Sequence, residues 1–439
     1  MKRPLILLVL VFICFAYASS FAQSIVRQRR GTHATNIATG STTLVVAAAV
    51  DHLDVVAREP TILEHPDGTL FVAGYGEPLP TLWKSRDRGA TWVHVNVGME
   101  GDGAIGNSDV DLAVAPDGTL YFVTMGFDRK ALEGTHISIG VTRDVGATWS
   151  WTLLSKTRFD DRPWVDVAPD GTVHVIWNDG SGICYAVSND RGRTWSERPR
   201  IHSSGGSSHL TVGPRGEIAV RVTPFSSSLI NSKEEINEAV DLVAVSTDAG
   251  RTWNKHVAPG HRDWSRAAFE AVPAYARHDR VPPPRYVETL AWDARGALYS
   301  VWTNREGLWV GRSLDHGDTW TRWNVAAESE VRYFPYLVAR GKGELAVAWF
   351  SGRGETLEAH VARIDVARGN TAPRLIESTP LRPDSWGGGR AANDPPYRDT
   401  AGEYLGLTFL RDGGLALVSP IQNRPAQRFG FSFWKIIAR

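Results

Sequence analysis

The sequence predicts an all-β protein, a seven-bladed β-propeller in which each blade is a four-stranded antiparallel sheet. Two repeats in the 439-residue chain point to this fold. An octet of the form [Ser/Thr]-x-Asp-x-Gly-x-Thr-Trp occurs five times, and a short hairpin turn centred on Gly occurs seven times. Self-similarity at a nearly constant spacing is typical of repeat architectures, in which small sheets pack on their neighbours.

The octets predict tight turns between antiparallel strands. They begin at Ser85, Thr142, Ser188, Ser246 and Ser313. In each octet the Asp carboxylate can accept hydrogen bonds from the backbone of its own turn, and the Gly supplies a positive φ. The Thr returns to a strand, and the Trp adds a large apolar side chain with one N–H donor. We therefore assign a structural role to Asp87, Asp144, Asp190, Asp248 and Asp315.

The seven hairpin turns set the number of blades. Their central glycines are Gly68, Gly118, Gly171, Gly216, Gly296, Gly343 and Gly413. Successive glycines are 45 to 53 residues apart, except for intervals of 80 and 70 residues. A four-stranded blade needs about 40–50 residues. Segments 254–285 and 371–398 fall in the two long intervals, are rich in Pro, Arg and Gly, and are interpreted as insertions.

The predicted blades close into a ring. They lie near 58–99, 108–155, 161–200, 205–257, 286–327, 332–377 and 400–437. The last blade shows only three strands, so we expect a strand near 42–50 to complete it and to remove the exposed edge. A six-bladed ring is the alternative. In this meander the long connections all lie on one face of the disc, and we expect the functional site there.

The N-terminus predicts export. Lys2 and Arg3 precede an apolar run from Leu5 to Phe15, and small residues at Ala18 and Ala22 follow. This is the pattern of a signal peptide, here 1–22, which would leave a single domain, 23–439, in the periplasm or outside the cell. The apolar run is too short to span a membrane. Only Cys184 remains after cleavage, so no internal disulfide is expected.

The composition narrows the classes of partner. Acidic and basic residues number 48 each, which argues against a nucleic-acid partner. The sequence has no zinc-ligand spacing, phosphate-binding loop or dinucleotide fingerprint, so we expect neither a metal nor a cofactor. The expected ligand is a glycan or another small molecule, and the oligomeric state stays open.

The octet resembles the Asp box, or BNR repeat, and the chain is similar over about residues 58–437 to secreted bacterial Asp-box propellers of the sialidase superfamily. In that family the boxes lie at the periphery of the disc. Sialidases bind a substrate carboxylate with three Arg and use a Tyr nucleophile activated by a Glu. The resemblance assigns these catalytic roles to Arg58, Arg285, Arg332, Tyr336 and Glu288.

Two positions depart from the sialidase pattern. Glu59 replaces the Ile of the family's Arg-Ile-Pro triplet, and Glu77 stands where an acid Asp is expected. The other residues expected to bind ligand at the axis are Glu59, Asp109, Asp161, Arg162, His209 and Tyr404. The preferred interpretation is a glycan-recognising protein. A catalytic exo-sialidase and a non-catalytic protein-interaction scaffold are the alternatives.

Overall fold

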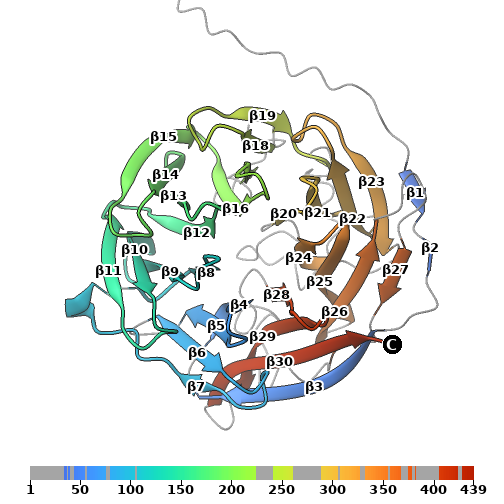
Figure 1. Ribbon diagram of the computed structural model, residues 1–439, viewed down its shortest axis with the longest axis horizontal. Coiled ribbons are helices and arrows are strands. Elements are labelled where there is room, and N and C mark those ends of the chain that lie inside the picture. The colour runs from blue at the N-terminus through green and yellow to red at the C-terminus, as the bar shows by residue number, and fades with distance from the viewer. Residues whose placement is uncertain are drawn as a thin grey trace, which may run out of the picture.

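The seven-bladed prediction is confirmed. The computed structural model describes residues 34–36, 38–39, 44–54, 57–75, 80–103, 106–223, 241–260, 288–304, 307–326, 332–353, 356–366, 374–377, 381, 405–423 and 428–439. Over these residues seven antiparallel sheets surround a central axis (Figure 1), so the six-bladed alternative is wrong. The predicted signal peptide and most of both predicted insertions lie outside the described residues.

The strands of each blade follow one another from the axis outward (Figure 1). Blades 1 to 3 contain β4 (Arg58–Glu64), β5 (Leu70–Tyr75), β6 (Thr81–Ser85) and β7 (Val93–His94); β8 (Val110–Val114), β9 (Leu120–Asp128), β10 (Glu133–Thr142) and β11 (Ser150–Ser155); and β12 (Asp161–Val167), β13 (Val173–Asn178), β14 (Ile183–Ser188) and β15 (Ser196–His202). Blades 4 and 5 contain β16 (Gly206–Val212), β17 (Ile218–Thr223), β18 (Leu242–Ser246) and β19 (Asn254–Val257); and β20 (Leu290–Trp292), β21 (Leu298–Asn304), β22 (Gly307–Ser313) and β23 (Thr321–Ala326). Blades 6 and 7 contain β24 (Arg332–Arg340), β25 (Glu344–Arg353), β26 (Thr356–Asp365) and β27 (Arg374–Glu377); and β28 (Gly406–Phe409), β29 (Leu415–Asn423) and β30 (Arg428–Ala438).

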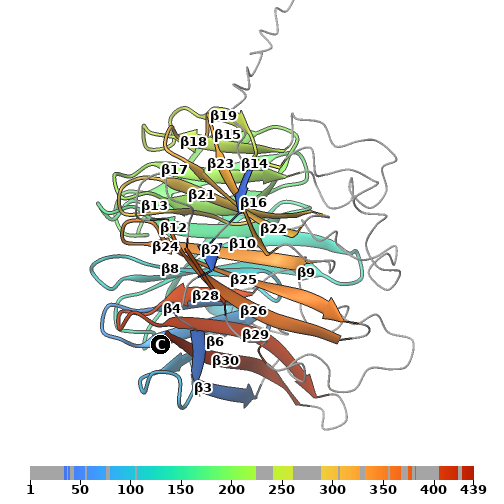
Figure 2. The same ribbon diagram turned by 90° about the vertical axis from the view of Figure 1, so that its right-hand side faces the viewer.

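The N-terminal part of the chain completes blade 7. Strand β3 (Leu44–Leu53) pairs antiparallel with β30 and supplies the fourth strand. Two shorter strands, β1 (Ala34–Asn36) and β2 (Ala38–Thr39), add in parallel to the outermost strands of blades 5 and 6. Figure 1 shows β1, β2 and β3 following one another along the outside of the ring, and Figure 2 shows β2 and β3 from the side. The segment therefore joins three neighbouring blades.

The octets form the turns predicted for them. In the first, Asp87 accepts hydrogen bonds from the Thr91 backbone N–H at 2.8 Å and from the Thr91 hydroxyl at 2.6 Å. The Thr91 hydroxyl contributes most to lowering the pKa of Asp87 to about 2. The Trp92 indole N–H donates to the Gly89 carbonyl at 3.1 Å. Asp144, Asp190, Asp248 and Asp315 accept the same two hydrogen bonds from the Thr of their own octets.

Each octet turn contains a second left-handed residue that the sequence did not predict. Gly89 has the expected positive φ, 91°, but Arg88 directly before it has φ 61°. Two successive residues in the left-handed region occur in all five octets, the first of them never Gly (Arg88, Val145, Arg191, Ala249 and His316). The octet turns and the Gly-centred hairpin turns meet at one end of the ring, which we call the turn face. We call the opposite end, where the inner strands begin, the loop face.

Apolar side chains between neighbouring sheets hold the blades together. Phe71 and Leu82 of blade 1 pack with Phe122 of blade 2, and Trp83 of blade 1 packs with Phe431 and Phe433 of blade 7. Full burial of each such side chain is worth about 1.5–3 kcal/mol. The ring is therefore stabilised mainly between sheets, with blade 7 and blade 1 joined in the same way as blades that adjoin in sequence.

Gly68 and Gly89 give a matched test of this packing. Both have φ near 90°, but a Cβ on Gly68 meets nothing within 4 Å, whereas one on Gly89 would lie 2.1 Å from the Phe433 ring. We expect Gly68→Ala to lower the free energy of unfolding by about 1 kcal/mol through backbone strain. Gly89→Ala should cost about 1–3 kcal/mol more, because it also forces the blade 7 core apart. Equal urea midpoints for the two variants would contradict this account.

Candidate functional site

Three inner strands begin with the same strained step on the loop face. Glu59, Arg162 and Phe334 have φ of 47°, 49° and 50°, and each directly precedes a Pro. The pairing with the next strand shifts register at each of these steps. A non-Gly residue in this region is uncommon, and such strain collects at functional sites where the surrounding structure enforces it. The loop-face ends of the inner strands are thus the best-marked candidate region.

Asp109, Asp161 and Arg162 come together in that region. The Arg162 Nε lies 3.8 Å from an Asp161 oxygen, and only 6% of Arg162 is exposed. Burial raises the pKa of Asp109 to about 6, the Asp161 carboxylate adds to that rise, and the Arg162 guanidinium opposes it. Burial also raises the pKa of Asp161. The Asp161 side chain is 39% exposed and Asp109 is half-buried, so two adjacent blades present a pair of acids beside one cation.

A short hydrogen-bonded loop, which leads into β12, carries an exposed aromatic residue. Asp160 is fully buried and accepts hydrogen bonds from Ser155 Oγ at 3.0 Å and from the N–H and hydroxyl of Thr157 at 2.9 and 2.7 Å. Phe159 donates its N–H to the Gly134 carbonyl at 3.0 Å. Phe159 is 51% exposed, and its φ is 68°. The loop therefore holds Phe159 outward, two residues before Asp161.

Two neighbouring residues pack against Phe159. The Arg158 guanidinium lies 5.2 Å from the centre of the ring and forms a two-pronged ion pair with Glu133. Gly180 lies against the Phe159 Cβ, where an added Cβ would be 2.9 Å away. An aromatic ring fixed in this way can stack on a ligand without a large loss of side-chain entropy.

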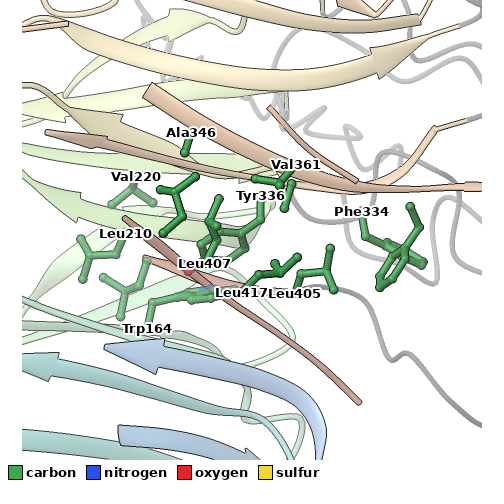
Figure 3. Packing of buried hydrophobic residues seen from close by; sticks show 14 of the residues in the cluster. Trp164, Leu210, Val220, Phe334, Tyr336, Ala346, Val361, Leu405, Leu407 and Leu417 are labelled. Atoms are coloured by element: carbon green, nitrogen blue, oxygen red, sulfur yellow. The ribbon is translucent and has the colours of Figure 1, made fainter. Parts of the chain in front are cut away.

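Deeper in the ring, side chains fill the axis. The Trp164 and His209 rings are 5.4 Å apart, and the His209 and Tyr336 rings are 6.0 Å apart. Blades 4 and 6 are not neighbours, so the second contact lies in the interior of the ring. Figure 3 shows Trp164 and Tyr336 among Leu405, Leu407 and Leu417. This layer separates the loop-face cluster from the turn face.

The same layer links successive inner strands by hydrogen bonds from backbone to side chain. Asp111 accepts from the Val165 N–H at 3.0 Å, His209 Nδ1 from the Leu290 N–H at 3.2 Å, and the Thr289 hydroxyl from the Leu337 N–H at 2.6 Å. Between blades 3 and 4, Asp166 accepts a hydrogen bond from the Val212 N–H at 2.7 Å. An inner strand is the edge of its sheet, and these contacts satisfy its unpaired donors.

Burial controls the ionisation of this layer. It raises the pKa of Asp111 to about 7 and that of Asp166 to about 6, and it lowers the pKa of His209 to about 3. Burial raises the pKa of Tyr336 far above its usual value, and the carboxylates of Asp111 and Asp166 add to the rise. Tyr336 is therefore held in its neutral phenol form, and His209 in its neutral imidazole form.

Glu288 belongs to a separate buried ion pair. It is completely buried and accepts from Arg221 Nη2 at 2.6 Å, while the same nitrogen lies 2.5 Å from Asp241. Burial by itself would lower the pKa of Arg221, but Asp241 and Glu288 hold it above the usual value. The sequence did not single out Arg221 or Asp241. A charged residue in the middle of the apolar strand β17 was the signal that could have revealed them.

The remaining sequence-predicted residues fall into three groups. Arg58 and Glu59 begin β4, and Glu59 is buried. Arg332 is buried at the start of β24, with its guanidinium 5.8 Å from the centre of the Trp349 ring. Arg285 and Tyr404 lie outside the described residues, so the proposed clamp of three Arg stays a prediction.

Within the described residues, no cluster of three or more His, Cys, Asp or Glu side chains could hold a metal ion. Burial raises the pKa of Cys184 to about 12, which does not favour a thiolate nucleophile. None of the helices in the described part of the chain has the length and apolarity needed to cross a bilayer.

Comparisons with known proteins support the fold. No family model and no curated protein sequence matches the chain. Among solved structures, an ulvan lyase bound to -[GlcA(1-4)Rha3S]- is 11% identical over 87% of this chain and 94% of its own, with a TM-score of 0.51. An α-L-arabinanase from Penicillium chrysogenum complexed with arabinobiose is 12% identical over 89% and 98%, with a TM-score of 0.47. The Hadza microbial sialidase Hz136 is 15% identical over 74% and 66%, with a TM-score of 0.42.

The match to the ulvan lyase supports a shared fold and assigns no activity. The protein is a seven-bladed β-propeller whose structural neighbours include sialidases and a polysaccharide lyase.

The neutral state of His209 gives a test of the axial layer. The pKa in the folded protein lies below the unfolded value of about 6.5, so this residue contributes stability above pH 6.5 that is lost as the pH falls towards 3. His209→Gln keeps an acceptor for the Leu290 N–H but does not titrate. We expect the stability advantage of the wild type over this variant to shrink between pH 7.5 and 4.5, as measured by urea unfolding.

Two further variants complete the pH experiment. His209→Ala removes both the acceptor and the ring between Trp164 and Tyr336, and should cost about 2–4 kcal/mol at pH 7.5. His94→Gln replaces an exposed histidine and should leave the pH profile unchanged. A pH-independent difference between the wild type and His209→Gln would contradict the proposed role of His209.

Proposed function

We propose that this protein is an exported glycan-binding propeller of the Asp-box, sialidase-superfamily type, and that a neutral sugar chain binds at the loop-face end of the axis. The observation that carries the proposal is the cluster of Asp109, Asp161 and Arg162, with the exposed Phe159 two residues before Asp161 in the chain. Carboxylates accept hydrogen bonds from sugar hydroxyls, the guanidinium donates to sugar oxygens, and the aromatic face covers the apolar face of a sugar ring.

The charges in this cluster favour a neutral sugar over sialic acid. A sialic acid carboxylate needs converging guanidinium groups, whereas this cluster offers two carboxyl groups and one guanidinium. A tyrosine nucleophile needs a nearby base and a lowered pKa. Tyr336 has a raised pKa, and the buried carboxylate of Glu288 is bound to Arg221. Sialidase chemistry at this tyrosine is therefore disfavoured.

A second candidate function is hydrolysis of the bound glycan. Glycosidases need one carboxyl group that is protonated near neutral pH and a second that is ionised. Asp109 has a pKa of about 6; on the adjacent blade, burial raises the pKa of Asp161 and the Arg162 guanidinium beside it opposes that rise. This arrangement supports an acid-and-base pair on the same site.

The test is calorimetric titration with neutral oligosaccharides selected by a glycan array. Asp109→Asn and Phe159→Ala should each weaken binding by about tenfold, the loss of roughly one hydrogen bond to a charged group or of one stacking contact. Glu197→Gln, on the exposed outer strand β15, is the matched control and should bind as the wild type does.

The same samples separate binding from catalysis. If the wild type releases new reducing ends and neither Asp109→Asn nor Asp161→Asn does, hydrolysis is established. If the wild type releases none, the protein binds the glycan without cleaving it. Release of sialic acid from a fluorogenic sialoside would favour the exo-sialidase instead. If the array yields no glycan and a pull-down from envelope extract retains a protein partner, the interaction scaffold replaces our proposal.

The proposal includes export, for which the apolar run Leu5–Phe15 after Lys2 and Arg3 is the support. N-terminal sequencing of protein expressed from the full gene should find a mature chain that begins after Ala22 or Ala18. Retention of Met1 in cytoplasmic protein would contradict this part of the proposal.

A further inference from the structure

A second concave site lies on the turn face, between blades 7 and 1. Its volume is about 620 Å³, which falls in the range of small-molecule pockets. The hairpin turns of blades 1 and 7, the first octet and strand β30 form its walls. The charged residues that line it are Glu64, Asp67, Arg86, Arg88, Arg411, Asp412 and Lys435.

All three carboxylates of this cleft are already bound within the protein. Glu64 accepts from the Arg411 backbone N–H at 2.6 Å. Asp67 accepts from the Thr69 N–H at 2.8 Å and lies 2.8 Å from His65 Nδ1. Asp412 accepts from the Gly414 N–H at 3.0 Å and forms an ion pair with Lys435.

The basic side chains of the cleft do not all have partners among the described residues. The Arg411 guanidinium donates to the Pro66 carbonyl, and Lys435 is paired with Asp412. Arg86 and Arg88 are both exposed, and within the described part of the chain neither guanidinium forms a hydrogen bond or an ion pair; Arg88 only adds to the lowering of the pKa of Asp412, of which the Lys435 hydrogen bond is the main cause. The unused hydrogen-bonding capacity of the cleft is therefore that of two guanidinium groups.

The arginines at the same positions of the other octets can be compared with Arg86 and Arg88. Arg191 holds the same octet position in blade 3 as Arg88 in blade 1, and it pairs at 3.0 Å with Asp117 in the hairpin turn of blade 2. Asp412 is the residue of blade 7 that corresponds to Asp117, but it forms its ion pair with Lys435. Arg143, the counterpart of Arg86, donates to the Arg191 carbonyl at 2.6 Å. One additional cation, Lys435, thus distinguishes the cleft between blades 7 and 1.

We propose that this cleft binds an oxyanion-bearing small molecule, a sulfate or phosphate ester, through Arg86 and Arg88. A guanidinium group presents a planar set of donors that matches such an oxyanion, and two of them provide both charge and orientation. The left-handed conformation of Arg88, φ 61°, is fixed by the octet turn, so the base of its side chain is already positioned. The site is independent of the glycan site on the loop face.

The experiment titrates inorganic sulfate and inorganic phosphate into the full-length protein by calorimetry, with chloride keeping the ionic strength constant. The wild type should show saturable binding of one of these ions, and the relative affinities of the two distinguish a sulfate ligand from a phosphate ligand. The double variant Arg86→Gln, Arg88→Asn should lose about tenfold or more in affinity, because both donors are removed. Asn is chosen at position 88 because it tolerates the left-handed region.

Matched controls come from the neighbouring repeats. Arg143→Gln and Arg191→Asn change the corresponding octet positions where the partners are satisfied, and both variants should bind the anion as the wild type does. Sulfate stabilises many proteins without binding to a site, and that effect would be non-saturable and equal in every variant. Such a result, or equal affinities of the wild type and the double variant, would overturn the proposal. Glycan binding should be unchanged in the double variant.

Discussion

The approach of the inner strands to the axis depends on one kind of contact, in which a side chain of one inner strand accepts the unpaired backbone N–H of the next. Asp111, Asp166, His209 and Thr289 make this contact across four successive boundaries, from blade 2 to blade 6. Each inner strand is the edge of its sheet, and an unpaired N–H buried there would cost about 1–3 kcal/mol. The contacts let the edges approach the axis closely, and apolar packing between the sheets supplies most of the stability.

This constraint separates polar residues that hold the ring from those that face a ligand. His209 was expected from the sequence to bind a ligand, and Asp111 and Asp166 lie in the same layer. The pKa values of all three are strongly shifted, but their side chains accept hydrogen bonds from backbone donors. Asp109, Asp161 and Arg162 lie at the loop-face ends of the same strands, and at Asp161 and Arg162 the pairing of β12 with β13 shifts register. Perturbed ionisation marks both groups, and only the geometry of the partners distinguishes them.

The octets and the hairpin turns were predictable because every interaction that defines them is local. Asp87 binds Thr91 four residues away, and the same bonds recur wherever the octet recurs. The left-handed conformation of Arg88 escaped prediction, since an Arg at that position carries no conformational signature. Glu288 was singled out by its place near a strand start, yet its partner Arg221 is 67 residues away in sequence. No pattern of spacing encodes that pairing.

The sequence by itself determined the seven blades, the turns that connect their strands and the class of ring they form, because these follow from local hydrogen bonds and a repeated length. Only the tertiary structure decided how the charges are shared. It joined Glu288 to Arg221, brought Asp109 beside Asp161, and gave Asp412 to Lys435 in place of Arg88. Electrostatic pairing depends on distances between blades, and those distances exist only once the ring has closed.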